Sequence, residues 1–448
     1  MYIEGIGYFA KVLGERFCPY LMQTLYPLLE KLGDETSYIS STAYLSLCDI
    51  CFACKYKTLD ELLKKNSDYL VNAISLRLRH YDQNKQCPLV LKVILQYSSV
   101  DILPLIDDTI QEVLSSLDDH YDNQAALFVG VLNELVKAVS RWFPCQKSQP
   151  NKATGGYSST KECSEISLLD DLLDYCKTLR VSEGQEEEVE ESHDQPEPEE
   201  EGFSDPDKKP PLPKHVILVK EVMARSKHLL SSKSGRLKLL VLDTVGFCCK
   251  ALSTHTDEVL PLIHEIWPAY RQRFIDEEKL VIKKAVETLV TMSECTGDFI
   301  RRRTVTDVFP KLILFLDKQG LISVQTGKAY LHTVAYKLQH SILTSIGTIC
   351  DNLMIEGNDL EEVMTTSMKY LSARQPRPLQ QTAMLLCKIF HRLAPDRLWL
   401  MLCDMSCPKD FVPPNPCLRQ LKFATQSSVR NEYTDNVKSV FVTLFDNT

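Results

Sequence analysis

Three cysteines lie three residues apart in the stretch SLCDICFACKY, at Cys48, Cys51 and Cys54. A C-x-x-C-x-x-C run begins the ligand set of bacterial-type iron–sulfur proteins, in which thiolates bind iron. That set needs a fourth cysteine followed by proline after three more residues, whereas this sequence has Thr58 and Leu59 there. On a helix the three thiols would lie within an arc of about 120°, the width of a buried stripe. The run therefore predicts packed helix residues, with a metal or cluster as the alternative.

A second group of possible metal ligands lies near the end of the chain, at Cys403, Cys407 and Cys417, with His391 upstream. Zinc sites built from three cysteines and one histidine usually contain closely spaced cysteine pairs, and this group has none. The prolines between Cys407 and Cys417 favour an irregular loop. We predict no metal site and no cofactor.

Catalytic motifs are absent from the sequence in the forms that carry a known mechanism. It contains no phosphate-binding G-x-x-x-x-G-K-[ST], no G-x-G-x-x-G, no G-x-S-x-G and no H-E-x-x-H. The ten histidines are scattered along the chain, and nothing in the sequence pairs one with a nucleophile and an acid. We therefore predict a protein that is not an enzyme and has no catalytic residues.

The charge of the chain is concentrated in one segment. The formal net charge is -9, and the stretch from Glu183 to Glu201 alone carries eleven carboxylates without a lysine or arginine. The rest of the chain is therefore close to neutral, which argues against nucleic acid as a partner because phosphate binding needs a concentrated basic surface. No apolar run approaches the roughly 18 residues of a membrane span, so we also predict no membrane partner.

Two short basic clusters stand out from this background, Lys283–Lys284 and Arg301–Arg303. They predict solvated helix faces, because charged residues are mostly exposed. The alternative is a basic ridge that binds an acidic peptide or a phosphate.

The elements that would position these residues are helices in pairs. Leucines recur at helical spacing over residues 21–32, a polar GDETS turn follows, and a second apolar stripe covers about residues 43–54. Asp34 or Thr36 is predicted to cap the second helix by accepting hydrogen bonds from its first amides. Similar pairs recur along the chain with a period of roughly 40 to 47 residues.

Prolines lie in the apolar face of several first helices, at Pro27, Pro104, Pro261 and Pro310, where we expect a bend. A bent first helix, an Asp-containing turn and a second helix are typical of HEAT repeats. The prolines and turns argue against a long coiled coil, which needs a sustained heptad pattern. The sequence therefore predicts an all-α fold, a HEAT-repeat α-solenoid with an armadillo-like superhelix, interrupted by an acidic disordered insert.

The domain organisation follows the loss and return of the apolar periodicity. The insert lacks the apolar residues needed to offset the entropy cost of ordering. A short amphipathic segment within it, residues 164–181, either packs on the solenoid as a helix or docks in a groove. We predict a first HEAT block at 1–143, an acidic, proline-containing disordered insert at 144–212, a second HEAT block at 213–408, and a C-terminal loop with a terminal helix at 409–448.

Two further expectations concern the insert and the start of the chain. Ser204 precedes Asp205 and Asp207 and follows the acidic run, a context that suits an acid-directed kinase, so we predict phosphorylation at Ser204. The sequence begins within repeat-like residues and without a polar capping helix. We therefore expect a part or a short form of a longer solenoid.

At NSDYLVNAISLRLRHYDQNKQCPLVL (66–91) and VLPLIHEIWPAYRQRF (259–274) the sequence resembles the C-terminal part of the Tel-two-interacting protein one family. That family supplies the HEAT-repeat subunit of the Triple-T co-chaperone complex. The resemblance implies a non-enzymatic scaffold that binds the other two Triple-T subunits and newly made phosphatidylinositol-kinase-like kinases of the mTOR, ATM, ATR and DNA-PK type. It also implies cooperation with the ninety-kilodalton heat-shock chaperone through its adaptor complex, and a cytoplasmic location, with the nucleus left open.

A solenoid exposes a long surface suited to holding the helices of other proteins. We place the partner-binding surface around residues 68–79 and 263–274, because tryptophan, tyrosine and arginine dominate protein interfaces. For tryptophan the alternative is core packing. A karyopherin-like HEAT transport receptor, or another HEAT adaptor, is the alternative function. The predicted partner-binding residues are Asp68, Tyr69, Arg77, Arg79, Trp267, Tyr270 and Arg271.

Overall fold

The computed structural model describes residues 2–119, 125–144, 212–326, 328–406 and 431–445. Contacts within the chain divide it into two compact units, one made of Met1–Cys145 with Leu212–Thr448, the other of Gln146–Pro211. All residues described here belong to the first unit. The helix predicted at 164–181 and the phosphorylation predicted at Ser204 fall outside these residues.

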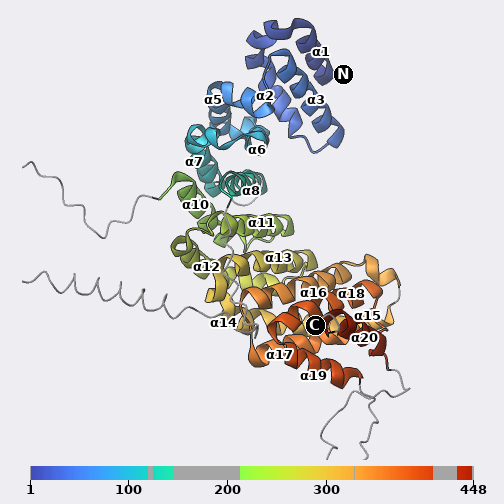
Figure 1. The fold of residues 1–448 in the computed structure, drawn as a ribbon. Coiled ribbons are helices and arrows are strands. Elements are labelled where there is room, and N and C mark those ends of the chain that lie inside the picture. Colours follow the sequence, from blue (N-terminus) through green and yellow to red (C-terminus); the bar gives the residue numbers. More distant parts are fainter. Residues whose placement is uncertain (1, 120–124, 145–211, 327, 407–430, 446–448) are drawn as a thin grey trace, which may run out of the picture. The chain divides into compact units, whose positions relative to one another are not determined.

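The described residues form helices joined by turns, and no strand occurs among them (Figure 1). The helices before residue 145 are α1 (Tyr2–Leu13), α2 (Leu21–Leu32), α3 (Ser37–Ala53), α4 (Leu59–Lys65), α5 (Ser67–Arg79), α6 (Cys87–Tyr97), α7 (Leu103–Asp119) and α8 (Ala125–Trp142). Those after residue 211 are α10 (Lys214–Leu229), α11 (Gly235–Ala251), α12 (Thr256–Arg271), α13 (Lys279–Thr296), α14 (Arg301–Arg303), α15 (Phe309–Gln325), α16 (Val334–Asn352), α17 (Gly357–Met368), α18 (Arg377–Leu393), α19 (Pro395–Ser406) and α20 (Thr434–Phe445).

The hairpin of α2 and α3 shows how the sequence produces one repeat. The leucine stripe of α2 is buried against α3, and the chain turns between them at Gly33–Thr36. Thr36 is the N-cap residue of α3, but its side chain makes no capping bond. Asp34 instead accepts a hydrogen bond from the Thr36 amide at 2.9 Å, which closes the turn one residue before the helix. The predicted capping of the helix amides is therefore wrong, while the predicted hairpin is confirmed.

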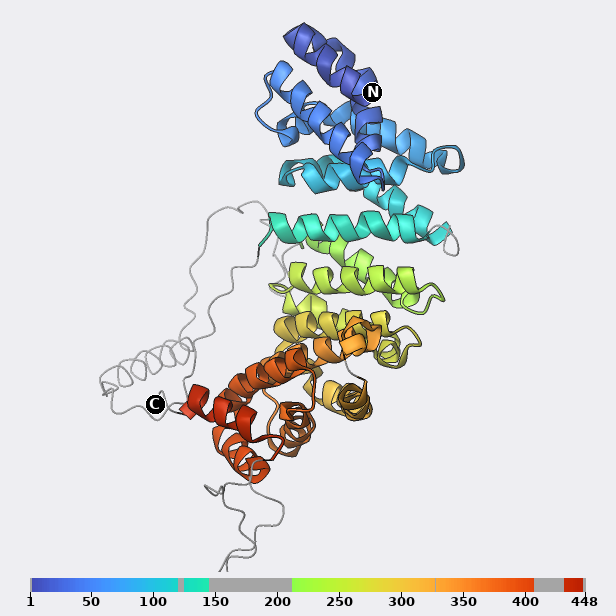
Figure 2. The same cartoon turned by 90° about the vertical axis from the view of Figure 1, so that its right-hand side faces the viewer.

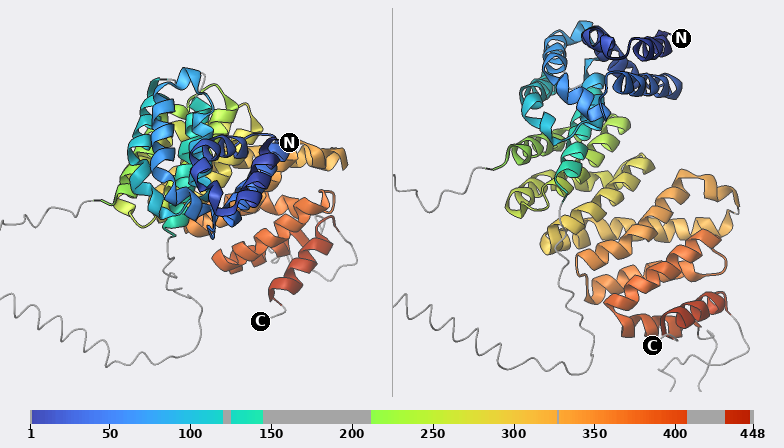
Figure 3. Two further views of the ribbon diagram at one scale, coloured as in Figure 1. Left: turned by 90° about the horizontal axis from the view of Figure 1, so that it is seen from above. Right: turned by 45° about the horizontal axis from the view of Figure 1, so that its top comes forward.

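Second helices of successive hairpins pack directly on one another. In Figure 2 the helices α8, α11 and α13 lie side by side in chain order, and α16 and α18 continue the series. First helices form a parallel series in which α10 contacts α12 and α15 contacts α17 (Figure 3, right). We call these two series the second-helix ladder and the first-helix ladder. The spacing between Gly235 and Lys279, the starts of α11 and α13, fits the roughly 40 to 47 residues of a HEAT-type unit.

The core is a continuous apolar cluster that runs through both ladders, and therefore no hairpin buries its apolar face alone. Its largest fully buried side chains include Phe128 of α8, Tyr270 of α12, Tyr370 and Phe390. The prediction of an all-α fold of stacked helical hairpins is confirmed. No helix among the residues described is long and apolar enough to cross a membrane.

The prolines fall into two structural classes. Pro27 and Pro261 lie inside α2 and α12, as predicted. Pro104 and Pro310 instead occupy the second positions of α7 and α15. At Pro104 the first turn of α7 has amides without intrahelical partners, so proline starts the helix rather than bending it, and the bend predicted there is wrong. Pro310 instead follows directly on the π-helical turn Thr304–Val308, so helical backbone continues on both sides of it. The bend expected at Pro310 stays a prediction.

Candidate protein-binding surface

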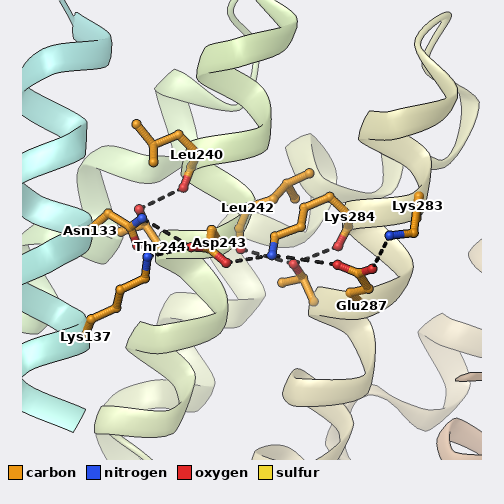
Figure 4. Close-up of polar contacts among 10 residues, drawn as sticks. Asn133, Lys137, Leu240, Leu242, Asp243, Thr244, Lys283, Lys284 and Glu287 are labelled. Carbon is orange, nitrogen blue, oxygen red and sulfur yellow. Dashed lines mark hydrogen bonds and ion pairs between the residues drawn. The ribbon is translucent and has the colours of Figure 1, made fainter. Parts of the chain in front are cut away.

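A network of charged and polar side chains crosses the second-helix ladder at Asp243 (Figure 4). The Asp243 carboxylate of α11 lies 2.6 Å from the ammonium group of Lys284 on α13 and 3.3 Å from that of Lys137 on α8. The Asn133 side-chain amide on α8 donates a hydrogen bond to the same carboxylate at 3.2 Å. One side chain thus bridges three consecutive second helices.

The Asp243 carboxyl group is held in its charged form. Its side chain is 25% exposed, and this burial acts to raise the pKa. The hydrogen bond and charge of Lys284, with smaller contributions from Asn133 and Lys137, outweigh that effect and leave the pKa of Asp243 below its usual value. The carboxylate is therefore charged at neutral pH and pairs with both ammonium groups.

The basic pair predicted at Lys283–Lys284 is neutralised within this network. Lys283 pairs with Glu287 at 2.8 Å on the same helix, and Lys284 reaches both Asp243 and Glu287 (Figure 4). We predicted a solvated helix face, and that prediction did not include the ion pair between Lys284 of α13 and Asp243 of α11. The network was not predicted, because the register of α8, α11 and α13 that brings these groups together is not encoded in any local motif.

An aromatic ring flanked by ammonium groups lies beside the network. The Lys137 and Lys250 ammonium groups are 5.2 and 5.7 Å from the centre of the Phe247 ring, within the range of cation–π attraction. Phe247 and Lys284 line a shallow cavity of about 200 Å³. Aromatic rings beside charged groups are typical of protein-binding surfaces, and this part of the second-helix ladder is a candidate for one.

The first-helix ladder is also tied together by ion pairs between neighbouring helices. Lys220 of α10 pairs with Glu258 of α12, and Arg225 of α10 pairs with Asp118 of α7 at 3.2 Å. These pairs are partly exposed, so each contributes little to stability.

Two of the predicted partner-binding residues lie in the core. The Trp267 side chain is 4% exposed, and its indole N–H donates to the Asp307 carboxylate at 2.9 Å. Tyr270 is fully buried, and its hydroxyl donates to the Ala285 carbonyl oxygen at 2.6 Å. We therefore correct their assignment to packing residues that hold α12 against its neighbours. An apolar or aromatic stripe at helical spacing looks the same whether it faces the core or a partner.

Arg271 lies on the same helix with its side chain 46% exposed, 3.7 Å from the Asp307 carboxylate. Asp307 thereby connects the buried Trp267 to the exposed Arg271. A partner-binding role for Arg271 stays a prediction.

The predicted residues of α5 have mixed environments. Asp68 is exposed. Tyr69 is half-buried, and its hydroxyl group donates a hydrogen bond to the Leu21 carbonyl oxygen at 3.2 Å. The Arg77 guanidinium stacks on the Tyr26 ring at 3.7 Å, which commits it to intramolecular packing.

Arg79 is exposed and pairs with Glu112 of α7 at 2.9 Å. In the first-helix ladder α7 and α10 lie between α5 and α12. The predicted partner-binding residues of α5 are therefore not brought next to those of α12.

The cysteine run does not form a metal site. Within the described ranges no group of three or more histidine, cysteine, aspartate or glutamate side chains is placed to hold a metal ion. Cys51 and Cys54 are buried, and burial raises the pKa of their thiols to about 11 and about 12. Cys48 is exposed, because six residues of helix rotate it about 120° from Cys54 and past the edge of the buried stripe. Packing is thus confirmed for two thiols and wrong for the third; Cys407 and Cys417 fall outside the described residues.

Comparison with known proteins connects this fold to one family. The family model described as the TTI1 C-terminal TPR domain matches residues 131–399, and the model described as TELO2-interacting protein 1 matches residues 25–114. The chain is 38% identical over 453 residues to the TELO2-interacting protein 1 homolog of Homo sapiens, and 38% identical over 452 residues to that of Mus musculus.

These alignments cover 97% of this chain and 41% of either mammalian protein, so the chain spans about two fifths of the length of these relatives. The TEL2-interacting protein 1 of Saccharomyces cerevisiae is 20% identical over 334 residues, which cover 66% of this chain and 32% of the yeast protein. The match to the C-terminal domain model extends over more than half of the chain. The chain therefore belongs to the TELO2-interacting protein 1 family.

Proposed function

We propose that this chain is a non-enzymatic scaffold that binds TELO2, the protein after which its mammalian relatives are named. In this proposal it acts as a subunit of a Triple-T complex with two partner subunits. The complex binds newly made phosphatidylinositol-kinase-like kinases and supports their chaperone-dependent maturation. Family membership is the observation that carries the proposal.

The architecture supports a scaffold on physical grounds. Two ladders of helices expose ordered rows of charged, polar and apolar side chains on rigid elements, which is what recognition of another folded protein needs. Polar contacts such as those of Asp243 keep neighbouring helices in fixed register. A partner that touches several repeats would therefore meet a preformed surface.

Arg79 and Arg271 are the residues we propose for partner contact on the first-helix ladder. Both are exposed enough to reach a second protein, and each pairs with a carboxylate that orients its guanidinium group. Arginine is enriched at binding hot spots because it combines charge with a planar apolar surface.

The test is binding of purified TELO2 to the purified chain, with Arg79→Glu and Arg271→Glu variants. We expect each variant to weaken binding by about tenfold or more, since a charge is reversed at the contact. Lys318→Glu is the matched control, because Lys318 is an exposed basic residue on α15 outside both predicted groups. Binding equal to that of the control would exclude Arg79 and Arg271 as contacts, and no binding by the parent chain would contradict the proposed function.

A further inference from the structure

A groove opens between α18, the last helix of the second-helix ladder, and α20, which packs against α18 and α19. It encloses about 370 Å³ and is lined by Met384, Leu385 and Lys388 from α18 and by Val440 and Leu444 from α20. The preceding pair has no such space: a Cβ atom at Gly347 of α16 would lie 2.3 Å from Leu386 Cδ1 of α18. At this crossing α16 and α18 are therefore close-packed, whereas α18 and α20 leave an open groove.

Hydrogen bonds tie α20 to its neighbours at one end of the helix pair. The Asn436 side chain near the start of α20 donates to the Gln380 side-chain oxygen at 2.8 Å and to the Leu371 carbonyl oxygen at 2.7 Å. These bonds fix α20 against the first turns of α18. Met384, Leu385 and Lys388 follow on the next turns of α18 and line the cavity.

The chemistry of the groove suits a third helix. Met384, Leu385 and Lys388 follow one another along one face of α18, and Leu385 is 60% exposed. Two helices that present an apolar floor of this kind bind the apolar face of an amphipathic helix, which contributes side chains at i, i+3, i+4 and i+7. The flexible side chain of Met384 can adjust its conformation to fit the side chains of the bound helix.

The charged side chains near the groove favour binding of one kind of helix over another. The sequence of α18 contains Arg377, Lys388 and Arg392 and no aspartate or glutamate. Arg392 pairs with Asp351 of α16, whereas Lys388 lies exposed at the edge of the groove. On α20, Asp435 and Lys438 are both exposed, and neither lines the groove. Lys388 is thus the one charged residue among those that line it, and an acidic helix complements this charge.

We propose that this groove binds an acidic amphipathic helix of TELO2, with its apolar face on Met384 and Leu385 and its carboxylates beside Lys388. The inference rests on the proposed function and adds the place and the chemistry of the contact. A reversed charge at position 388 would repel the carboxylates of the bound helix and weaken binding. A charged side chain at position 385 would be buried under that helix without an oppositely charged partner.

The experiment measures binding of purified TELO2 to the complete chain and to the variants Leu385→Glu and Lys388→Glu. We expect a loss of at least about tenfold in affinity for each, and a weaker salt dependence for Lys388→Glu than for the parent. Leu400→Glu on α19 is the control, because Leu400 is as exposed as Leu385 and does not line the groove. Hydrogen exchange on TELO2 then identifies the segment that the parent protects and Leu385→Glu does not.

The outcomes separate this inference from the proposed function. If the parent binds and Leu385→Glu binds as well as Leu400→Glu, the groove is not the contact and the scaffold function stands. Protection of a basic segment or of a loop of TELO2 would likewise overturn the groove assignment. If the parent does not bind TELO2, the proposed function fails and the inference fails with it.

Discussion

At the scale of single residues, Asp243 is the side chain on which the contact between repeats depends most clearly. Its carboxylate reaches α8 and α13 from α11 and has a pKa below its usual value. A carboxyl group with a lowered folded pKa adds stability above its unfolded pKa of about 4, and that stability is lost as the pH falls through the folded value.

We therefore expect Asp243→Asn to lower the free energy of unfolding by about 1–3 kcal/mol at pH 7. The difference from the parent should begin to shrink below about pH 4, where the carboxyl group of the unfolded chain becomes protonated, and should be lost as the pH falls through the lowered folded pKa. Urea unfolding across a pH series measures both effects. Asp351→Asn is the control, because the partner of Asp351 is the exposed Arg392 and such a pair contributes less than about 1 kcal/mol. Equal losses for both variants would refute the special role of Asp243.

At the scale of elements, a glycine allows α16 and α18 to approach closely at their crossing, whereas a glycine of α11 has free space around it. At Gly347 of α16 an added Cβ would lie 2.3 Å from Leu386 Cδ1 and 3.0 Å from Ile389 Cδ1, so α18 would have to move or repack. At Gly246 of α11 the nearest atom, Thr288 Cγ2, is 3.9 Å away, an ordinary contact.

The same substitution should therefore have opposite effects at these two positions. Gly246→Ala should stabilise the chain by about 0.5–1 kcal/mol, because alanine restricts the unfolded chain and favours helix. Gly347→Ala should destabilise it by about 1–2 kcal/mol through overpacking. Thermal unfolding of the two variants decides the matter. A gain of stability at Gly347 would show that α16 and α18 are not packed as closely as the structure has them.

Much of the helical hairpin pattern could be predicted, because leucines at helical spacing and short polar turns are local signals. The stripe of α2 and the turn at Asp34 are examples. The candidate surface could not be predicted in the same way. Asp243 acts only through the register of three helices, and Trp267 shows the same pattern in a core as it would on a surface. Whether such a residue lies in the core or on the surface depends on how neighbouring repeats pack, which the local sequence does not show.

At the scale of the whole molecule, the repeat architecture supports our proposal that this chain holds other polypeptides. Both helix ladders consist of repeats that bury their apolar faces against each other and present ordered outer faces. The family comparison supports the same proposal, because the mammalian relatives are named for interaction with TELO2. Binding that spreads over several repeats would explain why the side chains proposed for contact lie on separate helices.

The most direct measurement is affinity purification of the tagged chain from cells in which newly synthesised proteins are labelled by a short pulse. We expect TELO2 to co-elute in a fixed ratio to the chain, together with labelled phosphatidylinositol-kinase-like kinase that disappears from the complex during a chase. Recovery of the chain without TELO2 and without labelled kinase, while an unrelated helical-repeat control behaves identically, would contradict the account.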